Sequence, residues 1–130
     1  MNVNFTVFID KILSGEKRQT IRRNSPKWAN VKVGDKLTLY TRLRTKQCRK
    51  LGEAVVESIT PITLQSVNCW IEAHTPLGDF LLSLSDLQDL AHRDGFESLR
   101  DFFMFFCKTY VNKELEMVVI RWTDFKEAKR

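Results

Sequence analysis

Three side chains capable of chemistry lie within six residues of one another near the start of this chain, at Lys17, Thr20 and Arg22. A threonine hydroxyl is inert at neutral pH and becomes a nucleophile only when a base removes its proton. Lysine can be that base if burial or neighbouring cations lower its pKa from about 10.4 towards roughly 7–8. A carboxylate, for which Asp94 is the candidate, would orient the lysine or carry protons. Together these groups could perform nucleophilic catalysis.

A short helix followed by a strand is expected to position the first three residues. The helix is predicted from its apolar face and its ends: Phe5, Phe8, Ile9, Ile12 and Leu13 recur at helical spacing, with Thr6 as the N-cap and Gly15 as the stop. Beyond it, an extended chain would place Thr20 and Arg22 on one side and Ile21 on the other. Because positions 17 and 20 point to opposite faces of an ideal strand, the chain must bend after Gly15 for Lys17 and Thr20 to converge.

Asp94 is expected at a sharp turn between two further helices. Ser83, with Asp86 three residues later, resembles the start of a capped helix. Gly95 would end that helix, and Phe96 would fold back onto its last turn. Apolar residues at helical spacing predict the second helix, and we interpret them as core packing: Leu99, Phe102, Phe103, Phe106 and Tyr110.

The remaining periodicity is that of strands. Strands are expected over 36–40, 54–59, 62–64 and 117–122, with Pro61 separating the middle two. Residues 117–122 are apolar on both faces apart from Arg121, which is typical of a central strand covered on both sides. The pattern predicts an α+β protein of one domain, since 130 residues can bury one core and are too few for two.

The pattern Gly-x-Lys-x-x-Thr-x-Arg, from Gly15 to Arg22, resembles the ASCH family, a branch of the PUA-like β-barrels. A Val-Gly-Asp turn at 33–35 and the run from Ala91 to Phe96, with its acid-Gly-Phe ending, extend the resemblance over residues 5–122. It implies a small mixed β-barrel with flanking helices, as a single ASCH domain over residues 1–130.

The resemblance also implies an activity. Some small ASCH proteins are amidohydrolases that remove the acetyl group from N4-acetylcytidine, with a proposed catalytic set of lysine, threonine and glutamate. Lys17 and Thr20 match the first two residues, and Asp94 stands at the third position with a side chain one methylene shorter. Other members of the family bind RNA or are described as ribonucleases.

Positive charge is concentrated in residues 15–50, which hold twelve Lys or Arg against two acidic residues, a net charge of +10. The rest of the chain holds nine basic and fourteen acidic residues. Such a basic block favours a polyanionic partner, and arginine forks suit phosphates and base edges. The residues expected to bind RNA or a nucleotide are Lys17, Arg18, Arg22, Arg23, Arg42 and Arg44, with Trp28 and Tyr40 as candidates for stacking on an unpaired base.

Other classes of function are disfavoured by what the sequence lacks. The three cysteines are widely spaced, and neither a Cys-x-x-Cys pair nor a histidine cluster accompanies them. No disulfide framework, metal or cofactor is therefore expected. The N-terminal apolar stretch is interrupted by Asp10 and Lys11, and no run approaches the ~20 apolar residues of a membrane span. We expect a cytoplasmic monomer without a membrane partner.

The leading hypothesis is an RNA- or nucleotide-binding domain with a basic cleft around Lys17, Thr20 and Arg22. One alternative is the amidohydrolase acting on acetylated cytidine. Another is a metal-independent ribonuclease, which would use Lys17, Arg22 and a carboxylate, survive EDTA and need the ribose 2′-hydroxyl. Plainer interpretations stay open too: a solvated lysine at a helix end, an ordinary strand threonine, and an aspartate that only ends a helix.

Overall fold

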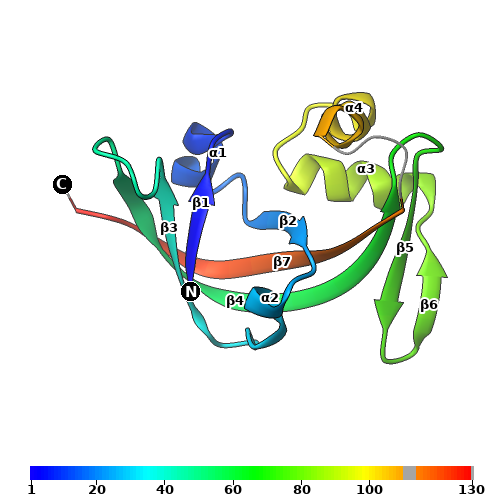
Figure 1. The fold of residues 1–130 in the computed structure, drawn as a ribbon, viewed down its shortest axis with the longest axis horizontal. Helices are drawn as coiled ribbons and strands as arrows, with labels where there is room; N and C mark the ends of the chain where they lie inside the picture. The colour runs from blue at the N-terminus through cyan, green and yellow to red at the C-terminus, as the bar shows by residue number, and fades with distance from the viewer. Residues whose placement is uncertain (110–113, 130) are drawn as a thin grey trace.

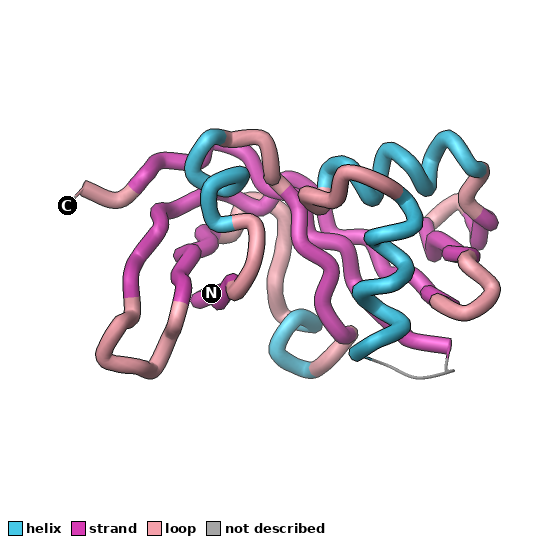
Figure 2. The backbone as a smooth tube through the Cα atoms, turned by 90° about the horizontal axis from the view of Figure 1, so that it is seen from above, coloured by secondary structure: helices cyan, strands magenta, loops and turns pink. Residues whose placement is uncertain are grey.

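The computed structural model describes residues 1–109 and 114–129, which form seven strands and four helices. In chain order these are β1 (Asn2–Phe5), α1 (Ile9–Ser14), β2 (Gln19–Arg23), α2 (Pro26–Ala29), β3 (Lys36–Thr41), β4 (Arg49–Gln65), β5 (Trp70–Thr75), β6 (Gly78–Leu81), α3 (Leu84–Arg93), α4 (Leu99–Thr109) and β7 (Glu114–Glu127). Figure 1 shows α1 and the α3–α4 pair above opposite ends of the long strands β4 and β7, with β2 between them. Figure 2 shows the same separation from above.

All seven strands belong to one mixed sheet. β1 pairs with β3 in parallel, whereas the other pairings are antiparallel. β7 lies between β2 and β4, and the path from β1 through β3, β4 and β5 ends at β6. The predicted mixed α+β fold is confirmed. The predicted barrel is not, because the pairings among the described strands leave the sheet open.

β7 divides the hydrophobic core into two clusters, one on each of its faces. Met117 and Val119 pack with the aromatic residues of α4, whereas Val118, Ile120 and Trp122 pack with β1 and β3. All five side chains are at most 4% exposed. The central, doubly covered strand predicted over 117–122 is therefore confirmed.

The N-terminal segment differs from the helix that its periodicity predicts. Phe5 ends β1, where it pairs with Thr41 of β3, and the helix begins only at Ile9. Phe8, with φ 59°, precedes the helix in place of the expected Thr6 cap, and no side chain caps it. The parallel pairing with β3 is a long-range interaction that outweighs the local helical spacing. Gly15 ends α1 with φ 84°, as predicted.

Pro61 also behaves differently from the prediction, because β4 runs through it without a break. It faces Val118 of β7 in the register of the sheet. Proline lacks an N–H, but its fixed φ is compatible with an extended chain, so a single proline removes one donor without ending the strand.

The turn between α3 and α4 follows the prediction closely. The Ser83 hydroxyl accepts a hydrogen bond from the Asp86 amide at 3.2 Å and caps α3. Gly95 has φ +107°, and the Phe96 amide donates back to the Ala91 carbonyl at 3.0 Å. This backbone arrangement carries Asp94 into the interior. In α4, Phe102, Phe103 and Phe106 are buried as predicted, whereas Tyr110 lies outside the described residues.

Among the described residues, no helix has the length and apolar character needed to cross a membrane.

Gly95→Ala is expected to destabilise the protein more than Gly34→Ala. Both glycines have positive φ, +107° and +94°, so alanine is strained at either position by about 1–2 kcal/mol. A Cβ at Gly95 would also lie 2.8 Å from the ring of Phe8, whereas nothing lies within 4 Å of a Cβ at Gly34. Urea unfolding should show about 1–3 kcal/mol of extra loss for Gly95→Ala, the usual cost of overpacking. Equal losses would contradict the contact with Phe8.

Candidate functional site

A cavity of about 250 Å³ lies where β1, β2, the turn after α3, and α4 meet. Five of the polar residues singled out in the sequence line it: Lys17, Thr20, Arg22, Arg23 and Asp94. Its apolar wall includes Phe5 and Phe8 from the segment after Asn4, and Phe96 from the turn after α3. The structure therefore brings all three candidate catalytic residues into one cavity.

Lys17 reaches the cavity because the chain bends after Gly15, as convergence with Thr20 requires. Its backbone amide donates to the Lys11 carbonyl at 3.0 Å, which folds the bend back onto α1. Its Nζ donates to the Asp94 carbonyl oxygen at 2.5 Å and lies 3.7 Å from Asp94 Oδ2. The two side chains are 5% and 9% exposed, so the ion pair is almost wholly removed from water.

Burial dominates the protonation of this pair. It lowers the pKa of Lys17 below its usual value, and the charges of Arg22 and Lys11 lower that pKa further, against the opposing effect of Asp94. Burial likewise raises the pKa of Asp94, against the effects of Lys17, Gln19 and Arg22. Both directions favour the uncharged forms. These are an amine that can accept a proton and a carboxylic acid that can donate one.

Gln19 supports Asp94 from β2, and sequence reasoning missed it. Its Nε2 donates to Asp94 Oδ1 at 3.3 Å and to the Leu90 carbonyl at 3.2 Å, and its Oε1 accepts from Arg121 Nε at 3.1 Å. The residue is 1% exposed. A glutamine next to a threonine matches no known sequence motif. The role of Gln19 arises from the β2–β7 register, which places it opposite Arg121.

Thr20 and Arg22 lie on the same side of β2, and Ile21 packs in the core, as the alternation predicts. Arg22 Nε donates to Thr20 Oγ1 at 2.9 Å, and Arg22 Nη2 donates to the Asn4 carbonyl at 2.7 Å. The guanidinium lies 4.9 Å from the ring centroid of Phe5. Thr20 thus contacts an arginine directly, while Lys17 donates to Asp94 from another side of the same cavity.

Asn4 is a second residue that sequence reasoning missed. Besides its carbonyl contact with Arg22, its Oδ1 accepts the Leu43 amide at 2.9 Å. The loop over residues 42–48 is thereby tied to the cavity wall. Nothing near Asn4 in the sequence signals this, because the contact spans 39 residues.

The residues expected to bind nucleic acid lie in different places: some are at the Lys17 cavity or in the loop beside it, and others are elsewhere. Arg23 is exposed and lines the cavity, and Arg42 and Arg44 are exposed in the tethered loop. Tyr40 is half-buried in β3. Arg18 lies apart, in a different cavity with residues of β7, where its Nε donates to the Gly15 carbonyl.

Trp28 cannot stack on a base as predicted. The residue is 6% exposed and packs in the core cluster that contains Trp122. The sequence placed it in the basic block, but α2 turns this residue inward.

Two solved structures resemble this chain in fold, and both are of ASCH from Zymomonas mobilis, one of them a mutant protein. Each gives a TM-score of 0.57 at 16% identity, with 97% of this chain and 68% of the other chain covered. No family model matches the sequence. No curated protein matches it either. The likeness establishes an ASCH-like fold, as the sequence motifs indicate.

The buried pair predicts a distinctive pH dependence when wild type is compared with Asp94→Asn. A raised pKa of Asp94 means that the folded protein holds a proton that the unfolded chain has lost above about pH 3.9. Wild type should therefore lose stability relative to Asp94→Asn as the pH rises above about 4, by at most ~1.4 kcal/mol per pH unit. Urea unfolding between about pH 4 and 7 measures this. A relative gain by wild type would show that the carboxylate is ionised and stabilised by Lys17.

Proposed function

We propose that this protein binds RNA or nucleotides, with one nucleotide unit seated in the Lys17 cavity. The observation that carries the proposal is the convergence of Lys17, Thr20, Arg22 and Arg23 on one cavity of about 250 Å³. This volume lies just below the usual range for drug-sized ligands, about 300–1,000 Å³, and suits a single base or nucleoside.

The cavity offers both kinds of contact that an unpaired nucleotide needs. Phe8, which is half-buried at the cavity, supplies aromatic surface of the type on which bases stack. The guanidinium of Arg22 and the amino group of Lys17 lie 4.9 Å and 5.3 Å from the ring centroids of Phe5 and Phe8, respectively. A base against the Phe8 ring would have the amino group of Lys17 directly beside it and the Arg22 guanidinium in the same cavity.

The exposed arginines would bind the flanking phosphates. Arg42 and Arg44 flank Leu43, whose amide is bound by the Asn4 side chain, and the Asn4 carbonyl accepts a hydrogen bond from Arg22. The loop and the cavity wall are thus joined through one residue. Three exposed arginines, Arg23, Arg42 and Arg44, therefore lie on the segments around the proposed site.

Substitution of these arginines should lower both RNA affinity and its salt dependence. For single strands, the log–log slope falls by about 0.7 for each phosphate that the protein no longer binds. We expect Arg23→Ala and the Arg42→Ala/Arg44→Ala double variant to show this decrease in fluorescence titrations with a labelled single-stranded RNA. Arg18→Ala is the matched control, since it removes the same charge from a different cavity. Salt-independent binding, or an equal decrease in Arg18→Ala, would contradict the proposed location.

A second candidate function is hydrolysis of an acylated cytidine, favoured by the buried Lys17–Asp94 pair beside Thr20. In this reaction Thr20 Oγ attacks the acyl carbon and Lys17 Nζ takes the hydroxyl proton. The C–N bond then breaks, and the proton passes to the departing nitrogen. Water next attacks the acyl-threonine ester, which releases the acid and restores the hydroxyl.

The arrangement of donors defines what must change when a substrate binds. The Thr20 oxygen accepts a hydrogen bond from Arg22, which leaves its own proton available to a base. Lys17 Nζ must turn from the Asp94 carbonyl towards that proton. Hydrogen bonds of this kind are often long or misaligned before substrate binds, so the observed contacts are compatible with the reaction.

Thr20 and Asp94 variants separate binding from hydrolysis. Deacetylation of N4-acetylcytidine, followed by chromatography, should be abolished by Thr20→Ala and by Asp94→Asn. Thr20→Ser, which keeps a hydroxyl, and Asp94→Glu, which restores the residue type of the family, should retain it. RNA binding should survive Thr20→Ala, because the arginines remain. Turnover that persists in Thr20→Ala would remove threonine as the nucleophile, and RNA binding without turnover in wild type would leave only the binding function.

A further inference from the structure

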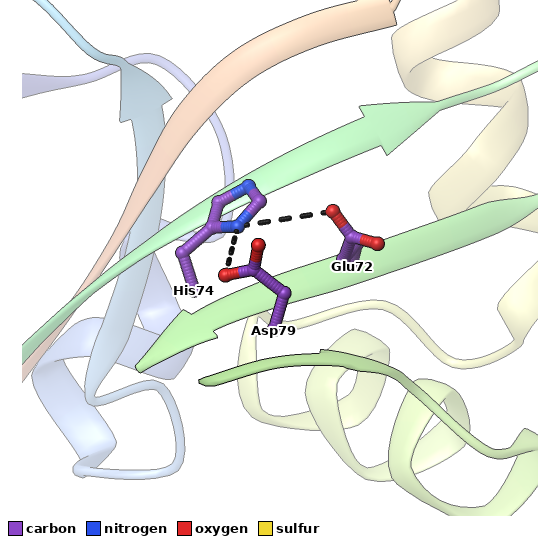
Figure 3. Close-up of side chains that lie close together, drawn as sticks. All are labelled: Glu72, His74 and Asp79. Atoms are coloured by element: carbon purple, nitrogen blue, oxygen red, sulfur yellow. Dashed lines mark hydrogen bonds and ion pairs between the residues drawn. The ribbon is translucent and has the colours of Figure 1, made fainter. Parts of the chain in front are cut away.

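Three side chains with metal-ligating groups meet on the β5–β6 hairpin, away from the Lys17 cavity. His74 Nδ1 lies 2.8 Å from Asp79 Oδ1 and 3.8 Å from Glu72 Oε1, and one ligand atom of each residue lies within 4.8 Å of the others. Figure 3 shows both carboxylates turned towards the same nitrogen of the ring. None of the three residues lines the cavity that contains Lys17.

The sheet register creates this cluster. His74 on β5 faces Asp79 on β6, and Glu72 lies two residues before His74, on the same face of the strand. The sequence spacing Glu-x-His followed by Asp five residues later is not a recognised metal motif. It therefore gave no signal, and the sequence alone predicts no metal site.

The opposite nitrogen of the ring, Nε2, is held by residues of the neighbouring strands β4 and β7. Thr63 Oγ1 donates to Glu116 Oε1 at 3.0 Å and lies 2.7 Å from His74 Nε2. Because the hydroxyl has one proton and gives it to Glu116, it must accept a proton from Nε2. This arrangement leaves Nδ1 directed at two carboxylates. Metal-binding histidines are typically oriented in this way, by a hydrogen bond to the nitrogen that does not bind the metal.

We propose that Glu72, His74 and Asp79 bind a divalent transition-metal ion of the Zn²⁺ class, with His74 Nδ1 and one oxygen of each carboxylate as ligands. One nitrogen and two carboxylate oxygens are accepted ligands for Zn²⁺, and three protein ligands leave a fourth position for water. The pair of carboxylates supplies two negative charges, which match the charge of the ion.

The distances fit such an ion after small movements. Ligand atoms around a tetrahedral zinc, with bonds of about 2.0–2.1 Å, lie about 3.3 Å apart. The separations from His74 Nδ1, 2.8 Å to Asp79 and 3.8 Å to Glu72, bracket this value. The side chains of Asp79 and Glu72 are 61% and 41% exposed, so each can adjust while Thr63 holds the imidazole.

Calorimetric titration with Zn²⁺ near neutral pH tests the proposal. Cys48, Cys69 and Cys107 are free thiols, so they are first blocked with iodoacetamide to prevent them from binding the ion. Wild type should bind one equivalent, and His74→Ala should not saturate at the zinc concentration that saturates wild type. His92→Ala is the matched control, because His92 is the other histidine in the chain and is exposed on α3. Absence of saturable binding in wild type, unchanged binding in His74→Ala, or equal loss in His92→Ala would each overturn the site.

Thr63→Val tests whether the hydrogen bond between Thr63 and Nε2 positions the His74 ring. It keeps the side-chain shape but removes the hydroxyl that accepts from Nε2, so zinc affinity should fall by about 10- to 100-fold with one equivalent still bound. Proton NMR in the presence of Co²⁺ gives an independent measure, since the ring signals of His74 should be perturbed by the paramagnetic ion and those of His92 should not. Unchanged affinity in Thr63→Val would exclude this positioning role, and equal perturbation of both rings would overturn the site. Neither result depends on whether the Lys17 cavity binds RNA.

Discussion

The contact between Lys17 and Asp94 is the constraint on which the candidate site depends. It joins the bend after α1 to the end of α3, segments 77 residues apart in the chain. Removing two ionisable groups from water costs several kcal/mol per ion unless partners compensate. Here the Asp94 carbonyl, the carboxylate and Gln19 provide those partners. The pair therefore contributes little net stability, but it fixes where the two segments meet.

Local patterns predicted the parts of this site that depend on neighbouring residues. The alternation of Thr20, Ile21 and Arg22 requires only an extended chain, and the turn at Gly95 requires only a residue that tolerates positive φ. The doubly apolar run over 117–122 likewise indicated a central strand from composition alone. The family-like motif added the expectation that Lys17 and Asp94 would meet, which neither residue indicates by itself.

The features that the sequence did not predict depend on contacts between residues far apart in the chain. Phe5 has helical spacing relative to its neighbours, yet it joins a strand because β3 pairs with it. Trp28 lies among basic residues but is turned inward by a single turn of helix. Gln19 and Asn4 act through contacts across 75 and 39 residues, and His74 meets Asp79 only through the hairpin register. In each case the deciding partner lies outside any local window.

Strand β7 connects the two candidate sites through residues on its opposite faces. Arg121 donates to Gln19, which holds the carboxylate of Asp94, and Glu116 accepts from Thr63, which holds the ring of His74. Positions 116 and 121 differ by an odd number, so their side chains point to opposite faces of the strand. A slip of one residue would exchange the faces and break both supports. Residues 117–120 are apolar and buried on both faces, so they would stay buried after such a slip, and it is the polar contacts of Glu116 and Arg121 that distinguish the observed register.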